Sequence, residues 1–180
     1  TAINPALGGE AGFRQMAAAL KAVGLGIILD IVPNHLAVGG SDNAWWLDVL
    51  ERGEASPYAG LFDIDWRPRD PALQGKVLAP FLGGPYGEAL AGGDIRLEAG
   101  PDGLLRATAY GHHQFPIRAA DRAEVFALGL EAYAPATNDG RARLHDLLER
   151  QAYRLAWWRT AGDEINWRRF FDITELAGVR

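Results

Sequence analysis

An unbroken apolar run near the start of the chain constrains its fold more than any other feature. Residues 26–36 read GIILDIVPNHL, with aliphatic side chains at nearly every position up to Val32. A strand with one face in water alternates apolar and polar residues, whereas a parallel strand buried on both faces reads as a continuous aliphatic run. The sequence therefore predicts a buried parallel strand over residues 26–32.

Three polar residues stand in and just after this predicted strand. Asp30 lies within it, and Asn34 and His35 follow Pro33, which has no N–H to continue a ladder. Open α/β sheets and β/α barrels build their sites at the carboxyl ends of parallel strands. Asp30, Asn34 and His35 are therefore the first candidate site residues. The alternative is that Asp30 and Asn34 only cap the turn and that His35 is a structural histidine.

A helix is predicted immediately before the strand. In residues 8–24, GGEAGFRQMAAALKAVG, Phe13, Met16, Ala17 and Leu20 recur at helical spacing, and Gly24 is a suitable C-terminal stop. Helix and strand together form one α-to-β unit of a parallel α/β fold. A second, short helix is expected over residues 43–52, closed by Gly53.

The amino-acid composition changes after residue 55. Glycine and proline become frequent, and strand-like pieces occur at residues 77–82, 95–98, 104–110 and 114–117, separated by turn signals such as GPDG. We expect a small antiparallel β excursion here. Further on, residues 141–162 place Leu144, Leu147, Leu148, Leu155 and Trp158 at helical spacing, which predicts one long helix ending at Gly162. TELA, residues 174–177, is also taken as helical.

Composition narrows the possible partners. The 180 residues are 48% hydrophobic, enough for one domain with a core, and the net charge of −5 comes without a basic run, which argues against nucleic-acid binding. The chain contains no cysteine, no apolar stretch of about 18 residues and no leader, so we expect a cytoplasmic protein with no membrane contact. It begins at Thr1 rather than at methionine, which suggests a piece of a longer protein.

The strand motif, an aspartate followed by x-x-x-Asn-His, resembles the first signature of the α-amylase superfamily of glycoside hydrolases. Three further stretches, residues 44–66, 75–90 and 144–180, resemble the maltooligosyl trehalose synthases within it. The resemblance implies an α/β fold, a partial (β/α)8 TIM-barrel segment with a small β-rich inserted subdomain. It also implies three parts: a barrel segment (1–54), the β-rich subdomain (55–117) and a helical segment returning to the barrel (118–180).

The same resemblance implies an activity for the parent protein. It would convert the reducing-end α-1,4 bond of a maltooligosaccharide to an α-1,1 bond without a cofactor. His35 would donate a hydrogen bond to the glucose at the cleavage subsite, and Asp30 and Asn34 would hold the strand end in place. No catalytic residue is expected in this segment, because the family's Gly-x-Arg-x-Asp nucleophile stretch, its acid/base glutamate and its His-Asp pair do not occur. The closing GVR (178–180) is interpreted as a look-alike of the first of these.

Two other functions stay open at this point: a related α-glucan hydrolase, and a non-catalytic carbohydrate-binding fragment. A homo-oligomer formed through exposed barrel edges is also conceivable.

Aromatic residues supply the remaining candidates. Trp45 and Trp46 are possible platforms for a sugar ring, but neighbouring helical residues point about 100° apart, so at most one of them should face a ligand and core packing is the competitor. Tyr86 lies in a predicted turn, from which it would reach a sugar or act as an ordinary turn aromatic. No metal site is predicted, since His112 and His113 should point to opposite faces of a strand. DEIN, residues 163–166, with Arg168 and Arg169 resembles a loop signature of the family, and this resemblance implies that Asn166 approaches the end of the 26–32 strand. The alternative is a salt-bridge cluster between helices.

Overall fold

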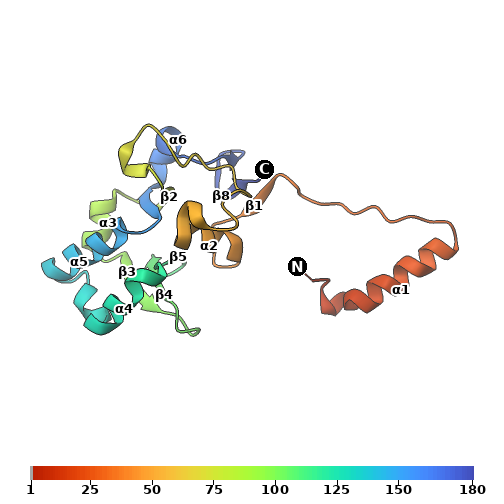
Figure 1. Ribbon diagram of the computed structural model, residues 1–180, viewed down its shortest axis with the longest axis horizontal. Helices are drawn as coiled ribbons and strands as arrows, with labels where there is room; N and C mark the ends of the chain where they lie inside the picture. The colour runs from red at the N-terminus through yellow and green to blue at the C-terminus, as the bar shows by residue number, and fades with distance from the viewer. Residues whose placement is uncertain (1) are drawn as a thin grey trace. The chain divides into compact units, whose positions relative to one another are not determined.

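The computed structural model describes residues 2–180, which divide into two compact units: the first ends at Pro33 and the second is Asn34–Arg180. The first unit contains the short 3-10 helix η1 (Pro5–Leu7) and the helix α1 (Gly9–Ala22), labelled in Figure 1. Gly8 is the N-cap residue before α1, with φ at +96°, and Gly24 follows the end of the helix with φ at +77°, a conformation that glycine adopts readily. The helix predicted over residues 8–24 is thus confirmed.

The buried strand predicted over residues 26–32 is wrong for this structure. These residues are extended but unpaired, and Ile28, Leu29 and Ile31 are 98%, 68% and 69% exposed. An aliphatic strand of this kind is stabilised by neighbours on both sides. Among the described residues, no strand pairs with the segment. The aliphatic pattern predicts burial, but the described residues do not cover this segment.

The second unit begins and ends in the same small antiparallel sheet. Its strands are β1 (His35–Ala37), β8 (Ile173–Gly178) and β7 (Arg169–Phe170), in the order β1-β8-β7. His35 pairs with Gly178, and the Val179 N–H donates to the Asn34 carbonyl at 3.1 Å. We call this paired entry and exit, residues 34–38 and 173–180, the neck. TELA therefore lies in a strand, which corrects the helix expected there.

A parallel pair occupies the middle of the unit, formed by β2 (Val77–Leu82) and β6 (Tyr153–Trp157). The long helix predicted over residues 141–162 is only half correct. Its first part is α5 (Asn138–Glu149), but the chain then turns and runs as β6 beside β2. Gln151 marks the break, because its side-chain amide donates to the Leu147 carbonyl at 2.7 Å and so satisfies an acceptor at the helix end.

The antiparallel excursion is confirmed for three of its four pieces. β3 (Ile95–Ala99), β4 (Leu105–Ala109) and β5 (His113–Pro116) form a meander, and the Gly103 N–H closes the turn on the Gly100 carbonyl at 2.9 Å. The fourth piece, β2, lies outside the meander because β6 gives it a parallel partner. The division into residues 1–54, 55–117 and 118–180 stays a prediction.

The remaining helices surround these strands. α2 (Ala44–Arg52) confirms the helix expected over 43–52, with the Asn43 side chain accepting from the Trp46 N–H at 3.0 Å and Gly53 following at φ +62°. The others are η2 (Gly53–Ala55), η3 (Pro71–Leu73), α3 (Tyr86–Gly92), α4 (Ala119–Leu128), η4 (Leu130–Tyr133), η5 (Trp158–Thr160) and α6 (Ala161–Glu164).

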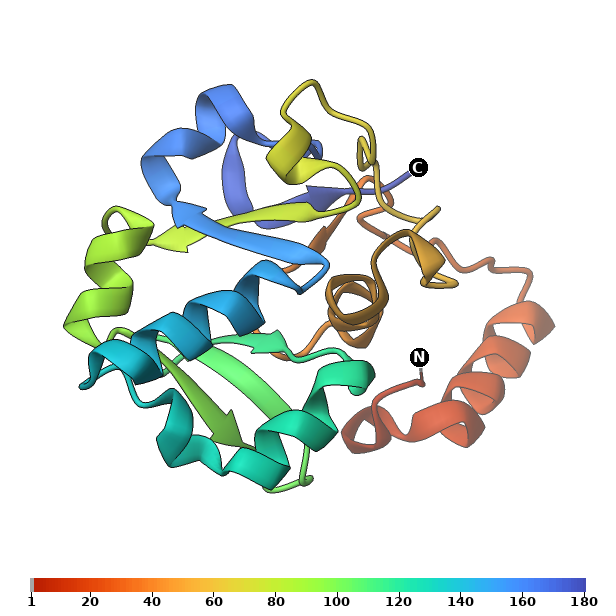
Figure 2. The ribbon, with the colours of Figure 1, turned by 60° about the vertical axis from the view of Figure 1, so that its left-hand side comes forward.

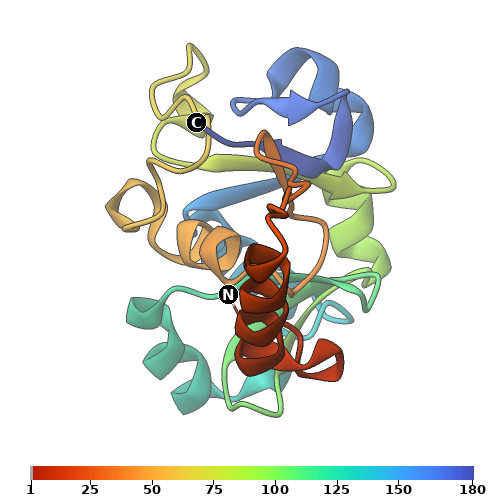
Figure 3. The same cartoon turned by 90° about the vertical axis from the view of Figure 1, so that its right-hand side faces the viewer.

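One hydrophobic core runs through the second unit. Trp46, Phe62 and Tyr153 are its largest fully buried side chains, and Leu144 and Leu147 of α5 are completely covered. Figure 2 shows α5 running between the β2–β6 pair and the meander. In Figure 3 the neck and its strands lie on one side of that pair and the meander on the other.

The architecture is mixed α/β. Within residues 2–180 the strands form two three-stranded sheets and one two-stranded pair, and no closed barrel. No helix in the described part of the chain has the length and apolar character needed to span a membrane.

Candidate functional site

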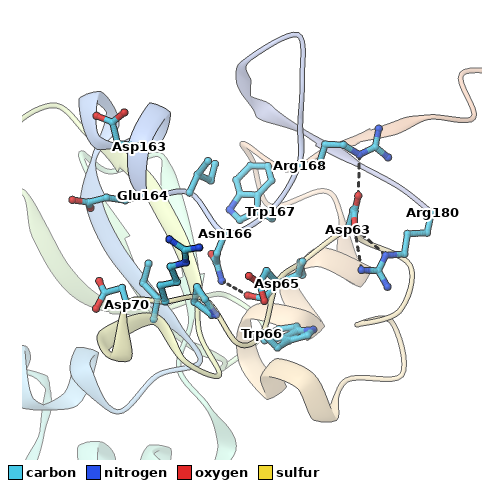
Figure 4. A pocket seen from close by; sticks show the side chains of 15 residues that line it. Asp63, Asp65, Trp66, Asp70, Asp163, Glu164, Asn166, Trp167, Arg168 and Arg180 are labelled. Carbon is cyan, nitrogen blue, oxygen red and sulfur yellow. Dashed lines mark hydrogen bonds and ion pairs between the residues drawn. The ribbon is translucent and has the colours of Figure 1, made fainter.

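A cleft of about 810 Å³ opens on the second unit, on the side of the neck (Figure 4). Its walls come from the loop of residues 63–73, the segment 163–168 and Arg180. Trp66 contributes an accessible aromatic ring, whereas Trp167 lines the cleft but is only 5% exposed. Five carboxylates also line it, at Asp63, Asp65, Asp70, Asp163 and Glu164. Such a mixture of aromatic faces and polar groups is typical of sites for polar small molecules.

An ion cluster fixes the neck end of the cleft. Asp63 Oδ1 accepts from Nε of Arg180 at 3.1 Å, and Oδ2 accepts from Nε of Arg168 at 3.1 Å. The hydrogen bond from Arg180 is the main cause that holds the pKa of Asp63 below its ordinary value. Desolvation is the next-largest effect and acts in the opposite direction, but the hydrogen bond from Arg168 and the charges of both arginines outweigh it. With both oxygens engaged by guanidinium groups, Asp63 is held as a carboxylate and serves to position the two arginines.

Asn166 forms the floor of the cleft. It is only 6% exposed, and its Oδ1 accepts from the Leu78 N–H at 2.9 Å. Its Nδ2 donates to the carbonyls of Asp65 and Lys76 at 2.9 and 2.8 Å. Next to it, the Trp167 indole donates to the Leu78 carbonyl at 2.8 Å. These bonds tie three distant segments together, so the cleft has a rigid base.

His35 lies in the neck, half-buried and close to the ion cluster. Its ring stacks on Phe170 with centroids 4.0 Å apart, and its Nδ1–H donates to Asn34 Oδ1 at 2.8 Å. The residue opposite it in the sheet is Gly178, where a Cβ would come within 2.9 Å of the Arg168 guanidinium carbon. A side chain at this position would press on the flexible guanidinium end of Arg168, which packs closely over Gly178 and also binds Asp63. His35 does not itself line the cleft.

The other predicted site residues do not line the cleft. Asp30 is exposed in the first unit. Trp45 is 39% exposed and stacks on Tyr58 with centroids 5.8 Å apart, whereas Trp46 is 2% exposed and packs in the core. Tyr86 begins α3, half-buried, with its hydroxyl 3.1 Å from Nδ1 of His145, and burial raises its pKa. Of the tryptophan pair, only Trp45 offers an accessible ring.

The two adjacent histidines lie closer together than a strand would place them. Their ring centroids are 4.2 Å apart, because His112 belongs to the turn before β5 rather than to the strand. His113 also contacts the Gly39 carbonyl, with 3.2 Å between its Nδ1 and that oxygen. Across residues 2–180, no cluster of three or more His, Cys, Asp or Glu side chains is arranged to hold a metal ion.

Sequence reasoning missed Asp63, Trp66 and Arg180 as cleft residues. Asp63 and Trp66 lie in the FDIDW stretch used for the resemblance, and Arg180 closes the GVR look-alike. No local pattern identifies them, since Asp63 meets its arginine partners across 105 and 117 positions of sequence.

Comparisons with known proteins are consistent with one another. No family model matches the chain. A curated protein of Mycobacterium tuberculosis, whose name refers to maltooligosyl trehalose synthase, is 38% identical over 182 residues that cover all of this chain and 19% of that protein. The solved maltooligosyltrehalose synthase of Arthrobacter ramosus is 33% identical with a TM-score of 0.68, over 100% of this chain and 20% of that one.

The whole chain is similar to part of maltooligosyl trehalose synthase. The resemblance drawn from the sequence is thereby confirmed. A solved glycosyltrehalose synthase agrees, with 28% identity and a TM-score of 0.70 over 99% of this chain and 22% of that one. The chain spans about a fifth of the length of these relatives, so the similarity concerns one part of a maltooligosyl trehalose synthase.

Proposed function

We propose that this chain is the part of a maltooligosyl trehalose synthase that forms a wall of its substrate cleft. The enzyme would convert the reducing-end α-1,4 bond of a maltooligosaccharide to an α-1,1 bond. The observation that carries the proposal is the match over the complete chain at 38% identity, which includes the neck and the cleft. The aromatic and polar lining of the cleft supports a polyhydroxylated ligand.

The first unit would complete a (β/α)8 barrel in the parent protein. α1 and the aliphatic segment at residues 26–33 have the pattern of one barrel helix and the next barrel strand, and the exposed Ile28 and Ile31 would be covered by neighbouring strands. The neck supports this arrangement, because a unit whose entry and exit pair side by side fits between two barrel elements without separating them.

His35 would contact the glucosyl unit at the reacting bond. Its Nδ1–H is used by Asn34, so in the neutral ring Nε2 carries the lone pair and would accept a hydrogen bond from a sugar hydroxyl rather than donate one. This refines the donor role expected from the family. Asp30 and Asn34 would orient the strand end, and Trp45 remains a candidate stacking surface.

The bond-breaking groups would come from other parts of the protein. Retaining transfer requires a nucleophile and an acid/base about 5 Å apart. Asp63 is unsuited to either task, since both of its oxygens are bound by arginines. The contribution of this segment would be to bind and to exclude water, the competing acceptor of the glucosyl group.

The test is a product assay with the full-length protein and maltopentaose. The expected result is loss of reducing ends without release of glucose, together with a product resistant to reduction by borohydride. Release of glucose in step with bond cleavage would show a hydrolase instead. Sugar binding without turnover, followed by tryptophan fluorescence, would show a carbohydrate-binding role.

The same assay on a His35→Ala variant tests whether this residue of the neck takes part in the reaction. Loss of one hydrogen bond made to the reacting sugar should lower kcat/KM roughly ten- to a hundredfold, corresponding to about 1.5–3 kcal/mol. An unchanged kcat/KM would show that His35 does not contact the reacting sugar. A cytoplasmic location and a homo-oligomer stay predictions.

A further inference from the structure

A second groove, of about 420 Å³, adjoins the cleft. It lies along the parallel β2–β6 pair, with Trp157 at the carboxyl end of β6 and Tyr86 four residues after β2. Carboxyl ends of parallel strands are where open α/β sheets bind ligands. The groove is within the size range of small-molecule sites.

The groove adjoins the cleft. Asp70, Leu73 and Glu164 line both and stand at the boundary between them, so a ligand that passes over these residues would reach from the cleft into the groove. A short ligand would fill the cleft alone, whereas an extended one would occupy both. The two openings therefore suit a chain of repeating units better than two unrelated small molecules.

The lining combines aromatic rings with hydrogen-bonding groups that are not fully used. Trp157 and Tyr86 supply the rings, and the Tyr86 hydroxyl is held by His145. Glu164 makes no ion pair within residues 2–180. The ion pair of Arg154 with Glu149 is long, with 3.7 Å between Nε and Oε1, so its guanidinium can also bind a ligand. A glucosyl ring has an apolar C–H face for the aromatics and hydroxyls for the carboxylate and the guanidinium.

We propose that this groove is a subsite for glucosyl units of the maltooligosaccharide that are remote from the reacting bond. The inference rests on the proposed function and adds a residue-level basis for chain-length preference. Trp157 would stack on one glucosyl unit, and Glu164 would accept hydrogen bonds from its hydroxyls. Longer chains would gain affinity from these contacts, and chains too short to leave the cleft would not.

The test compares substrates of two lengths in the full-length protein. For Trp157→Ala, kcat/KM for maltoheptaose should fall about three- to tenfold, the effect of losing one aromatic contact, while the value for maltotetraose changes less than about twofold. Glu164→Gln, a surface change that does not threaten folding, should shift the ratio of the two values in the same direction.

Trp158→Ala is the matched control. Trp158 is 54% exposed, is absent from the groove lining and shares the cation–π contact of Arg159, whose guanidinium lies 4.9 Å from the Trp157 ring and 5.3 Å from the Trp158 ring. This change should leave the ratio of the two substrates unaltered. If Glu164→Gln and a folded Trp157→Ala also leave the ratio of the two kcat/KM values unaltered, the proposed subsite is refuted.

Failure of the subsite and failure of the proposed function give different results. A wild-type protein that forms the α-1,1 product, with variants that lose activity equally on both substrates, refutes only the subsite. A wild-type protein that forms no such product refutes the proposed function. In that case, calorimetric titration with maltoheptaose still decides the groove, because equal affinity of wild type and Trp157→Ala counts against it.

Discussion

Asn166 offers the sharpest test of how the cleft is held together. Its side chain makes three hydrogen bonds of 2.8–2.9 Å to backbone groups of Asp65, Lys76 and Leu78, and it is 6% exposed. Asn166→Ala removes all three and leaves buried backbone groups without partners. At about 1 kcal/mol for each bond, the free energy of unfolding should fall by about 3 kcal/mol, and Tm by about 6–12 °C.

Asn166→Asp separates hydrogen bonding from packing. The substitution keeps the volume and the acceptor for the Leu78 N–H, but a carboxylate then faces the carbonyls of Asp65 and Lys76. It should therefore be as damaging as Asn166→Ala, although it leaves no cavity. The control is Asn138→Ala at the exposed start of α5, for which we expect a change within about 0.5 kcal/mol.

The assay is thermal and urea unfolding of the 180-residue chain, followed by circular dichroism. If Asn166→Ala and Asn138→Ala lower Tm by the same few degrees, the three bonds contribute nothing net and the reasoning is refuted. If Asn166→Asp is as stable as wild type, filling the space matters more than donating to the two carbonyls.

Three further predictions concern other parts of the chain. Trp46→Ala should cost about 3–5 kcal/mol by urea unfolding, because its buried ring contacts Phe62 and Trp167, and Trp45→Ala should cost about 1 kcal/mol or less; equal losses would contradict the packing. Burial acts to raise the pKa of Asp121, but hydrogen bonds from Arg118 and Gln151 outweigh it and the pKa is lowered. The difference in unfolding free energy between wild type and Asp121→Asn should therefore be complete above about pH 5. It should disappear as the pH falls below 3.8 and through the lowered pKa of the folded state, and a difference that does not change with pH would refute the ion network. Ile28→Ser should change the stability of this chain by less than about 0.5 kcal/mol but that of the full-length protein by about 2–5 kcal/mol, and an equal effect in both would contradict the barrel strand.

Local signals predicted the parts of the fold that local interactions determine. The glycines that bound α1 and α2, and the turn before β4, are visible in the sequence because few other residues adopt a positive φ. The three meander strands follow from alternation between such turns. The motif singled out Asn34 and His35, which lie in the neck and do not line the cleft, and their role in binding stays a prediction. Asp63 carries no such local signal, because its partners are more than a hundred positions away.

The wrong predictions of secondary structure concern segments whose structure depends on a strand far away in the sequence. Leu148, Leu155 and Trp158 continue the helical spacing of α5, yet residues 153–157 become a strand because β2 offers a parallel edge and Gln151 satisfies the helix end. The 26–32 run shows the reverse case, an intrinsic strand pattern without a partner among the described residues. Periodicity alone does not distinguish these outcomes.

The neck has a consequence for protein engineering. Since His35 and Gly178 face each other across one antiparallel ladder, their Cα atoms are only about 4.5–5.5 Å apart, the span of a tight turn. Residues 34–180 are thus a cassette with adjoining splice points. Inserted into a surface hairpin of an unrelated host, the cassette would replace the turn without forcing the host strands apart.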